Sequence, residues 1–398
     1  MNLTIIKNGF IQNPDCPKIK ANIAIHKNKI VEISASLEFE VCKGMDIVNY
    51  IDAKGLTITP GLVDQHTHGG YGIDFNKASA EDIVSLTKKM PQHGITSLVA
   101  TVMTDSEENL NQQIKEISVA IENQPASSTK IAGIHLEGPF LNPDFKGIHP
   151  DNYILEPNIE NFKKFENKNI KIVSYAPELD KNLELTRYLA ERNIIISAGH
   201  SKATHEVIEF AAKKGLKQVT HLFNAMPSLH HRNPGIIGES LTNDDIFVEV
   251  IADNEHLHPI IIDLILRTKP KSKIIFISDS LPLNQSSENH IIFGGQKIYR
   301  QNKRRENDSA SLQGLNSFIA VNENGTFAGS LSFLDENLRK NITKINFSNF
   351  LTFASLNPAK NLELKTKGFI DKGFDADLVL WDENFQIKQT LINGLIAF

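Results

Sequence analysis

Cysteine is scarce in this sequence, and the scarcity limits the kinds of site that the chain can build. Two cysteines, Cys16 and Cys42, occur among 398 residues. Two thiols are too few for a disulfide framework or for a cysteine-based zinc site, so any bound metal must be held by histidine and carboxylate side chains. So few thiols fit a reducing compartment, and we expect the protein in the cytoplasm.

The sequence also lacks long apolar runs and a strong excess of one charge. The longest apolar run, at 259–266, is interrupted by Asp263, and the N-terminus has no basic region followed by an apolar core. A formal net charge of -5 and a pI near 6.3 argue against a general nucleic-acid binder. We therefore expect neither nucleic-acid nor membrane partners, while a local basic site could still hold a small anion.

What the sequence does contain is a regular succession of strand-like and helix-like segments. At 40% hydrophobic and 22% charged residues, its composition is that of an ordinary globular protein with room for a large domain and a small one. Short β-type runs between turns occur at 3–6, 21–25, 30–33 and 46–51, and again at 368–370, 376–381 and 390–394. They predict a small β-sandwich domain built from both termini, residues 1–58 with 365–398.

From about residue 60 to residue 350, apolar runs of strand length alternate with longer amphipathic segments, which favours a parallel sheet. Eight strand candidates lie at 62–68, 97–103, 131–137, 171–176, 194–200, 218–224, 247–253 and 273–279. Helix-like segments between them lie at 81–93, 110–122, 181–192, 203–214 and 260–268. Eight such units predict an α/β fold with a (β/α)8 TIM-like barrel, assigned to residues 59–364.

The carboxyl ends of the predicted strands carry many side chains that can bind metals. Side chains two apart on a strand point to the same side, so His66 and His68 can face one point. Later strands end in further histidines and carboxylates, namely Glu137, His200, His221, Asp253 and Asp279. Because the carboxyl ends of barrel strands converge on one mouth, the sequence predicts that these residues meet there. Taken singly, each could instead be a turn cap, a helix cap or a buried, hydrogen-bonded side chain.

Residues 284–315 interrupt the alternation of strands and helices. The stretch 299–311 is polar and charged without an apolar period, which predicts an exposed loop. We interpret its basic cluster at 303–305 as solvated surface rather than as a binding site. The sequence contains no Walker-type phosphate loop.

Several motifs, taken together, resemble one known family. They are PGLVDQHTHG at 60–69, HLEGPF at 135–140, KGIHP at 146–150, AGHS at 198–201, THLFNAMP at 220–227, RNPG at 232–235, IADNEH at 251–256, SD at 278–279, GTFAGS at 325–330, NPAK at 357–360 and DADLV at 375–379. Over most of its length the chain is similar to the N-acetylglucosamine-6-phosphate deacetylases of the amidohydrolase superfamily. The LEGP and THxxNAM blocks together are specific to that family, whereas other amidohydrolases share only the His-x-His pair and the acidic residue of strand eight.

The resemblance implies metal-dependent hydrolysis of the N-acetyl group of N-acetyl-D-glucosamine 6-phosphate, giving D-glucosamine 6-phosphate and acetate. The residues implied to hold the main divalent metal are Glu137, His200 and His221. Family members with the His-x-His pair place a second metal there, here at His66 and His68. Imidazole and carboxylate ligands suit zinc or iron, and a bound divalent metal lowers the pKa of its water towards about 7, which makes hydroxide available.

The resemblance also implies catalytic and binding roles. Asp279 would be the general base and acid, and His149 would polarise the acetyl carbonyl. Of the two residues implied at the phosphate, Arg232 and His256, the arginine has a planar fork suited to that group. The full set implied to bind the phosphorylated amino sugar is Ile148, His149, Asn224, Ala225, Arg232, His256, Phe327, Ala328 and Gly329. A homodimer is implied as well.

Two departures from the family pattern and two alternative functions remain. The family's usual Thr-Asp-Ala is Ser278-Asp279-Ser280 here, and the segment after it is atypical, which leaves the sugar specificity open. One alternative is an amidohydrolase acting on a different N-acyl sugar or a cyclic amide, although Ala176 to Glu178 stands where many such enzymes have a bridging lysine. The other is a non-catalytic relative, although such relatives usually lose metal ligands and this chain keeps them.

Overall fold

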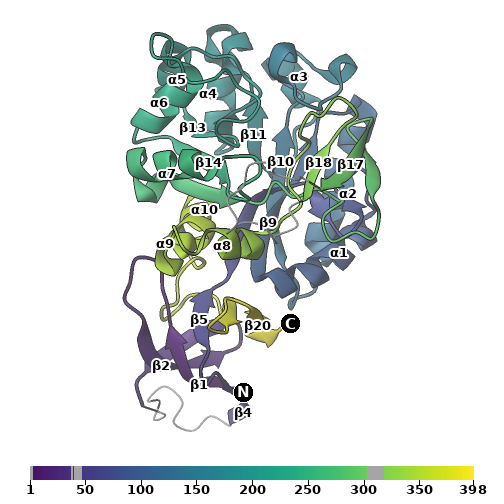
Figure 1. The fold of residues 1–398 in the computed structure, drawn as a ribbon. Coiled ribbons are helices and arrows are strands. Elements are labelled where there is room, and N and C mark those ends of the chain that lie inside the picture. The colour runs from purple at the N-terminus through teal and green to yellow at the C-terminus, as the bar shows by residue number, and fades with distance from the viewer. Residues whose placement is uncertain (1–2, 37–38, 40–46, 303–317) are drawn as a thin grey trace.

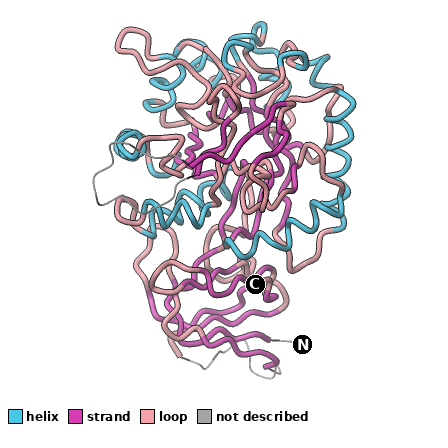
Figure 2. The backbone as a smooth tube through the Cα atoms, turned by 45° about the vertical axis from the view of Figure 1, so that its right-hand side comes forward, coloured by secondary structure: helices cyan, strands magenta, loops and turns pink. Residues whose placement is uncertain are grey.

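The computed structural model describes residues 3–36, 39, 47–302 and 318–398, which form a large barrel and a small sheet. The barrel occupies the upper part of Figure 1, and the small sheet lies below it with both chain termini. The tube in Figure 2 shows the strands of the barrel enclosed by helices and loops. No helix in these described ranges is both long enough and apolar enough to cross a lipid bilayer.

The barrel contains eight parallel strands, as the sequence predicts. They follow one another around the sheet in chain order and comprise β6 (Leu62–Thr67), β9 (Ile95–Met103), β10 (Lys130–Glu137), β11 (Ile170–Tyr175), β12 (Ile195–Ala198), β13 (Leu216–Val219), β14 (Phe247–Ile251) and β15 (Ile274–Ile277). The last four strands are shorter than predicted. Each of them ends two residues before the polar side chain expected at its end, so these side chains stand on the turns that follow the strands.

Two backbone hydrogen bonds join the first and last barrel strands just beyond their ends. The N–H of Asp279 donates to the carbonyl of His66 at 2.9 Å, and the N–H of His68 donates to the carbonyl of Ser280 at 2.8 Å. The barrel therefore closes at the same level at which its polar side chains gather.

The helices follow the strands on the outside of the barrel. For example, α1 begins at Ser79, whose hydroxyl accepts from the N–H of Asp82, and it buries Ile83 and Leu86 against the barrel core. The helices are α1 (Ala80–Lys89), α2 (Glu107–Asn123), α3 (Ile159–Lys163), α4 (Glu184–Ala190), α5 (His205–Ala212), α6 (Gly235–Thr242), α7 (Pro259–Thr268), α8 (Leu334–Asn341), α9 (Phe347–Leu351) and α10 (Asn357–Asn361). The predicted helix at 81–93 ends in a 3-10 turn at Pro91, and α3 and α6 were not among the predicted segments.

One layer of the barrel interior is apolar, and residues at the end of the helical region cover it. Val63, Val99 and Ile172 form a buried cluster with Ala359 of α10 and with Leu362. The chain passes from the small sheet into the barrel through Gly61, where a Cβ atom would lie 2.1 Å from the Thr96 hydroxyl oxygen. This close approach requires glycine and fixes β6 against β9 at its first residue.

The small sheet is built from both ends of the chain, as predicted. Its strands run in the order β21-β20-β19-β5-β1-β2-β3, with β4 also paired to β1. They are β1 (Leu3–Ile11), β2 (Ile19–His26), β3 (Lys29–Ser34), β4 (Ile47–Asp52), β5 (Thr57–Pro60), β19 (Leu378–Trp381), β20 (Ile387–Ile392) and β21 (Leu395–Ile396). The expected strand at 368–370 is wrong. Gly368 has a φ of 80° and packs against the backbone of Leu356 and Ser355, which leaves no extended run there.

The segment after strand eight contains more order than the sequence predicts. Its strands β16 (His290–Phe293), β17 (Gln296–Asn302) and β18 (Phe318–Val321) form a three-stranded antiparallel sheet. The loop prediction is therefore wrong for residues 299–302, which pair with β18. The sheet is held in place because Phe293 and Ile298 are buried against Met103 and Ile148. The rest of that loop, including the basic cluster at 303–305, lies outside the described residues.

Candidate active site

A cavity of about 240 Å³ opens at the carboxyl ends of the barrel strands. The residues predicted from the sequence that line it are His68, Glu137, Ile148, His149, His200, His221, Asn224, Ala225, His256, Asp279, Phe327, Ala328 and Gly329. His66 is fully buried within 3.5 Å of Glu137, and Arg232 is exposed on the segment before α6, away from the lining. The fold thus brings all but one of the predicted residues to one place.

The first group of possible metal ligands is Glu137, His200 and His221. Glu137 Oε1 lies 3.3 Å from His200 Nε2 and 3.0 Å from His221 Nε2, and the two nitrogens are 3.1 Å apart. Ligand atoms bound tetrahedrally at about 2.0–2.1 Å from one ion are roughly 3.3 Å from each other. The three side chains therefore have the spacing of a preformed cation site.

The second group consists of His66, His68 and the same Glu137. The other carboxylate oxygen, Glu137 Oε2, lies 3.2 Å from His68 Nε2, and Glu137 Oε1 lies 3.5 Å from His66 Nε2. Asp279 Oδ1 adds a further oxygen at 3.4 Å from His66 Nε2 and 3.3 Å from His68 Nε2. Glu137 stands between the two groups and belongs to both.

The hydrogen bonding and charge of these residues fit a divalent cation. His66 Nε2 and Asp279 Oδ1 are buried without a hydrogen-bond partner among the described residues, which is costly unless a ligand satisfies them. Burial lowers the pKa of His68, but hydrogen bonds to Asp279 and Glu137 outweigh it and raise that pKa to about 9. The buried carboxylates thus require positive charge at this point, which imidazolium protons or a bound cation can provide.

Three of the site residues have an unusual backbone conformation. His200, His221 and Asp279 have φ angles of 48°, 31° and 49°, a region that residues other than glycine seldom occupy. Such strain persists only where the surroundings hold it, and it clusters at functional sites. The turns after β12, β13 and β15 are therefore shaped to aim these side chains inward.

His149 is held in one tautomer beside Glu137. The backbone N–H of Thr104 donates to His149 Nδ1 at 3.3 Å, and the Thr104 hydroxyl is 2.9 Å from the same atom. An Nδ1 atom that accepts leaves the proton on Nε2, which lies 3.6 Å from Glu137 Oε2. Burial lowers the pKa of His149 to about 4. The ring therefore presents a neutral N–H donor to the cavity.

The lining of the cavity also includes His256, which forms a charged pair with the buried Asp253. Asp253 Oδ2 lies 2.8 Å from His256 Nδ1 and also accepts from the Ser330 hydroxyl at 2.9 Å. Burial lowers the pKa of His256, but the Asp253 carboxylate outweighs this effect and raises that pKa above its ordinary value. His256 also makes an edge contact with Phe327, with ring centroids 5.2 Å apart. This pair gives the cavity an imidazolium suited to an anionic group.

Sequence reasoning missed several residues of the site. Met103 and Phe293 line the cavity, and Phe293 comes from β16, in the segment 284–315 that interrupts the alternation of strands and helices. Glu249 lies behind His66, and its signal was readable, because it is an acidic residue inside the apolar strand sequence FVEVI. Glu178, at the end of strand four, accepts hydrogen bonds from Asn142 and Ser201 and supports the loops around the site.

A parallel barrel with histidines and carboxylates at the carboxyl ends of its strands is the arrangement of the amidohydrolases. The sequence profile of the amidohydrolase family matches residues 57–397. The chain therefore belongs to the amidohydrolase family.

Individual proteins narrow this assignment. The chain is 35% identical over 349 residues to the N-acetylglucosamine-6-phosphate deacetylase of Bacillus subtilis (strain 168), which covers 86% of this chain and 84% of that protein. It is 32% identical to the Homo sapiens protein of the same name, over 87% of this chain and 85% of the other. The solved structure of the Thermotoga maritima deacetylase covers 99% of both chains with a TM-score of 0.85 and 27% identity. Within the amidohydrolases, the chain is a member of the N-acetylglucosamine-6-phosphate deacetylases.

Proposed function

We propose that the protein hydrolyses the N-acetyl group of N-acetyl-D-glucosamine 6-phosphate, giving D-glucosamine 6-phosphate and acetate. The observation that carries the proposal is that four features meet around one cavity. They are two groups of candidate metal ligands, which have Glu137 in common, the carboxylate of Asp279 and the N–H donor of His149. The membership of the chain in this deacetylase family supports the same reaction. No other activity is favoured by a feature of the site.

The cofactor that we propose is one or two divalent cations, zinc or iron. The main site would use Glu137, His200 and His221, and the second site would use His66 and His68. When bound, such a cation lowers the pKa of water and polarises a carbonyl oxygen. Imidazole and carboxylate donors suit either metal.

The remaining chemistry belongs to Asp279 and His149. Asp279 accepts the proton of the attacking water as the new C–O bond forms, and it later delivers that proton to the amine as the C–N bond breaks. The amine must be protonated to leave, so one carboxylate serves both steps. His149 donates its Nε2–H to the carbonyl oxygen, on which negative charge develops.

Substrate binding is proposed for the remaining residues of the cavity lining. The imidazolium of His256 would hold the phosphate, and Asn224 and Ala225 would line the path between phosphate and amide. The residues proposed to contact the sugar are Ile148, Phe327, Ala328 and Gly329. In these assignments the anionic end of the substrate meets a cationic side chain rather than the carboxylates Glu137 and Asp279.

Arg232 supports a proposed homodimer. Arg232 is exposed and does not line the cavity of its own chain. Large apolar side chains are exposed close by, namely Phe210 on α5, Leu229 before α6 and Ile260 on α7. These helices lie on one side of the barrel in Figure 1. A second copy of the chain would cover this face. Arg232 of one copy would then contact the substrate phosphate bound in the cavity of the other copy.

Mixing two inactive variants tests this assignment. Arg232→Ala copies and Asp279→Asn copies, mixed and reassociated, should regain function at about a quarter of the sites if Arg232 serves the neighbouring copy of a two-fold dimer. Sedimentation velocity of the wild-type protein should show a dimer. A monomer, or no regain of activity on mixing, would contradict the assignment.

The domain division and the cellular setting are proposals too. We propose residues 59–364 as the catalytic domain and residues 1–58 with 365–398 as the second domain. Two cysteines in the whole sequence support a cytoplasmic setting.

The experiment that tests the function is a deacetylation assay on a panel of N-acyl sugars, with and without a 6-phosphate, combined with metal analysis. We expect the phosphorylated N-acetylglucosamine to have the highest kcat/KM. Preference for another N-acyl sugar would indicate a related amidohydrolase instead. Absence of turnover with metal bound would indicate a non-catalytic relative.

A further inference from the structure

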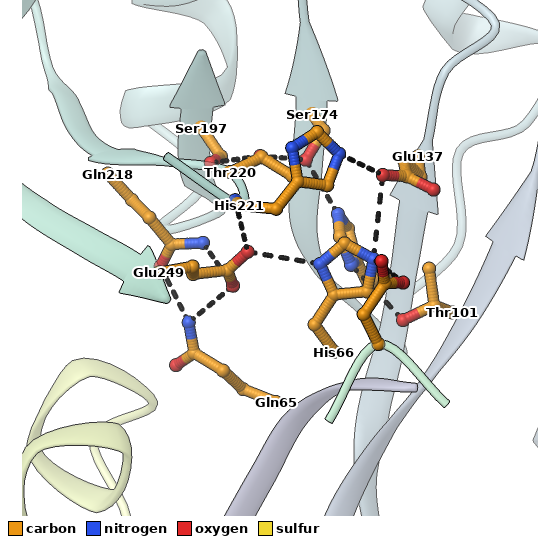
Figure 3. A network of polar contacts seen from close by, with 12 residues as sticks. Gln65, His66, Thr101, Glu137, Ser174, Ser197, Gln218, Thr220, His221 and Glu249 are labelled. Carbon is orange, nitrogen blue, oxygen red and sulfur yellow. Dashed lines mark hydrogen bonds and ion pairs between the residues drawn. The ribbon is translucent and has the colours of Figure 1, made fainter. Parts of the chain in front are cut away.

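Glu249 is a buried carboxylate in the middle of β14 that the proposed mechanism does not use. Its side chain is 0% exposed, and Figure 3 shows it beside the ring of His66, joined to one ring nitrogen by a dashed line. Glu249 Oε2 lies 3.0 Å from His66 Nδ1 and 3.4 Å from the backbone nitrogen of His221. Glu249 Oε1 accepts from Gln65 Nε2 at 2.7 Å and from Gln218 Nε2 at 2.8 Å. Four donors therefore converge on one carboxylate.

The neighbouring amides are oriented so that Glu249 meets only donors. Asn361, at the end of α10, donates its Nδ2–H groups to the side-chain oxygens of Gln65 at 3.0 Å and Gln218 at 2.7 Å. With their oxygens turned towards Asn361, both glutamines present their nitrogens to Glu249. A side chain at position 249 must consequently accept at both of its ends.

This acceptor determines the tautomer of His66. Because Glu249 accepts, His66 Nδ1 carries the proton and His66 Nε2 keeps its lone pair. That lone pair faces Glu137 and Asp279, at 3.5 and 3.4 Å, and has no hydrogen-bond partner among the residues that the structure describes. The arrangement prepares His66 Nε2 to bind a cation.

The other histidines of the site are supported differently. His200 Nδ1 is 3.0 Å from the backbone carbonyl of Phe145, which fixes its ring through a neutral acceptor. The Nδ1 atoms of His68 and His221 have no partner in the described part of the chain. A carboxylate behind the ring thus distinguishes His66 from the rest of the ligand set.

We propose that Glu249 is a positioning residue that sets the cation affinity of the half-site formed by His66 and His68. This inference rests on the proposed metal site. It adds that Glu249, a residue outside the cavity lining, holds the ligand His66 in place. A carboxylate that accepts from a ligating imidazole fixes its ring and raises its basicity, and loss of such a partner typically weakens metal affinity about 10- to 100-fold. A role in packing alone would be served by neutral side chains without burying a charge.

Glu249→Gln is the main test, because an amide of the same shape cannot accept at both ends. In one orientation, the NH₂ group of the new glutamine would face His66 Nδ1. In the other, it would face the NH₂ groups of Gln65 and Gln218. Either orientation disturbs the contacts that hold the His66 ring. We expect the second equivalent of metal to bind about 10- to 100-fold more weakly, while the first equivalent keeps its affinity.

The measurement is a titration of the metal-free protein with Zn²⁺ in competition with a chromophoric chelator, followed by repetition with Co²⁺ and recording of its visible absorption. Ser174→Ala is the matched control, because Ser174 belongs to the same buried polar region and bonds His135 and Thr220 but no ligand nitrogen. It should leave both affinities unchanged. In a His66→Ala background, Glu249→Gln should cause no further loss.

The outcomes separate this inference from the metal site on which it rests. If His66→Ala retains both equivalents, the metal assignment itself fails. If His66→Ala loses one equivalent while Glu249→Gln binds both as the wild type does, the role of Glu249 alone is overturned. Equal weakening of both equivalents in Glu249→Gln, or the same weakening in Ser174→Ala, would also overturn it.

A second variant keeps the test decisive if circular dichroism shows that Glu249→Gln does not fold. Glu249→Asp retains the charge but is one methylene shorter, so its contact with His66 Nδ1 must lengthen. We expect an affinity for the second equivalent between those of the wild type and His66→Ala. Wild-type affinity in Glu249→Asp would overturn the proposal.

Discussion

Asp279 is fixed in place by its main chain as well as by its neighbours. Its φ of 49° turns the side chain inward, and its N–H is bound to the carbonyl of His66. We predict that Asp279→Asn keeps its metal but loses turnover by about 10²- to 10⁴-fold or more, because the amide cannot accept the proton. Steady-state kinetics with metal analysis checks this. Asp263→Asn, on the exposed face of α7, is the control, and more than a tenth of wild-type turnover in Asp279→Asn would contradict the role.

Glu137 is shared by the two ligand groups, whereas His66 belongs to one. Because the oxygens of Glu137 face His200 and His221 on one side and His68 on the other, Glu137→Ala should lose the main metal and activity together. His66→Ala should lose at most one equivalent. Metal content after dialysis measures both variants, and equal losses would mean that the site is not divided in this way.

His256 should make binding of the phosphorylated sugar depend on pH. With its pKa raised, His256 keeps its charge to a higher pH than an ordinary imidazole and loses it as the pH rises through the raised value. We expect KM for the phosphorylated sugar to increase over that range and KM for unphosphorylated N-acetylglucosamine to stay level. In His256→Gln the pH dependence should vanish. The pair with Asp253 also adds stability that is complete between about pH 4 and pH 6.5. This stability declines at higher pH as the raised pKa of His256 is passed, and at lower pH as the lowered pKa of Asp253 is approached.

At the scale of elements, the hairpin of β16 and β17 contributes a wall of the cavity. Its turn has two glycines with positive φ, at 57° and 73°, and it places Phe293 with its ring centroid 5.3 Å from that of His68. Gln296 Nε2 donates to the carbonyl of Ile148 at 3.0 Å, which ties the hairpin to the loop bearing His149. The hairpin is therefore part of the site rather than an appended surface loop.

Substitutions at adjacent hairpin positions test this packing. Phe293→Ala should lower the free energy of unfolding by about 3–5 kcal/mol, because it empties a buried aromatic position. Ile292→Ala, at a side chain that is 53% exposed, should change it by less than about 0.5 kcal/mol. Denaturant unfolding followed by fluorescence compares the two, and equal effects would mean that the hairpin does not pack as described.

The barrel strands could be predicted from the sequence because each is a short apolar run followed by a turn and an amphipathic helix. The hairpin was missed, although its consecutive apolar residues Ile291 to Phe293 precede a Gly-Gly turn, because a long polar stretch follows it. Its packing against Met103 and Ile148, which are distant in the chain, comes only from the fold. The gathering of the candidate ligands at one place could be predicted from strand ends and from the family motifs. The polar side chains beside His66 were not predicted. Glu249 stands out in the sequence as an acidic residue within an apolar strand, but only the fold brings it together with Gln218 and Asn361.

For the whole molecule, metal removal should reduce stability as well as activity. A ligand that binds only the folded state at about 100 times its Kd contributes roughly 2.7 kcal/mol. We expect the midpoint of thermal unfolding to fall by several degrees after chelation and to recover when Zn²⁺ is restored. Scanning calorimetry of both forms measures the shift. The His66→Ala/Glu137→Ala double variant should show none.

Because β6 and β15 are joined where the site residues lie, hydrolysis requires that the last barrel strand has been synthesised. A backbone hydrogen bond joins His66 and Asp279, although His66 lies on the first barrel strand and Asp279 follows the last one. During synthesis, a ribosome-bound chain therefore contains the proposed ligands His66 and His68 long before it contains Asp279, the proposed base. Hydrolysis can begin only after the last strand has docked. Activity in a growing chain would thus report barrel closure in real time.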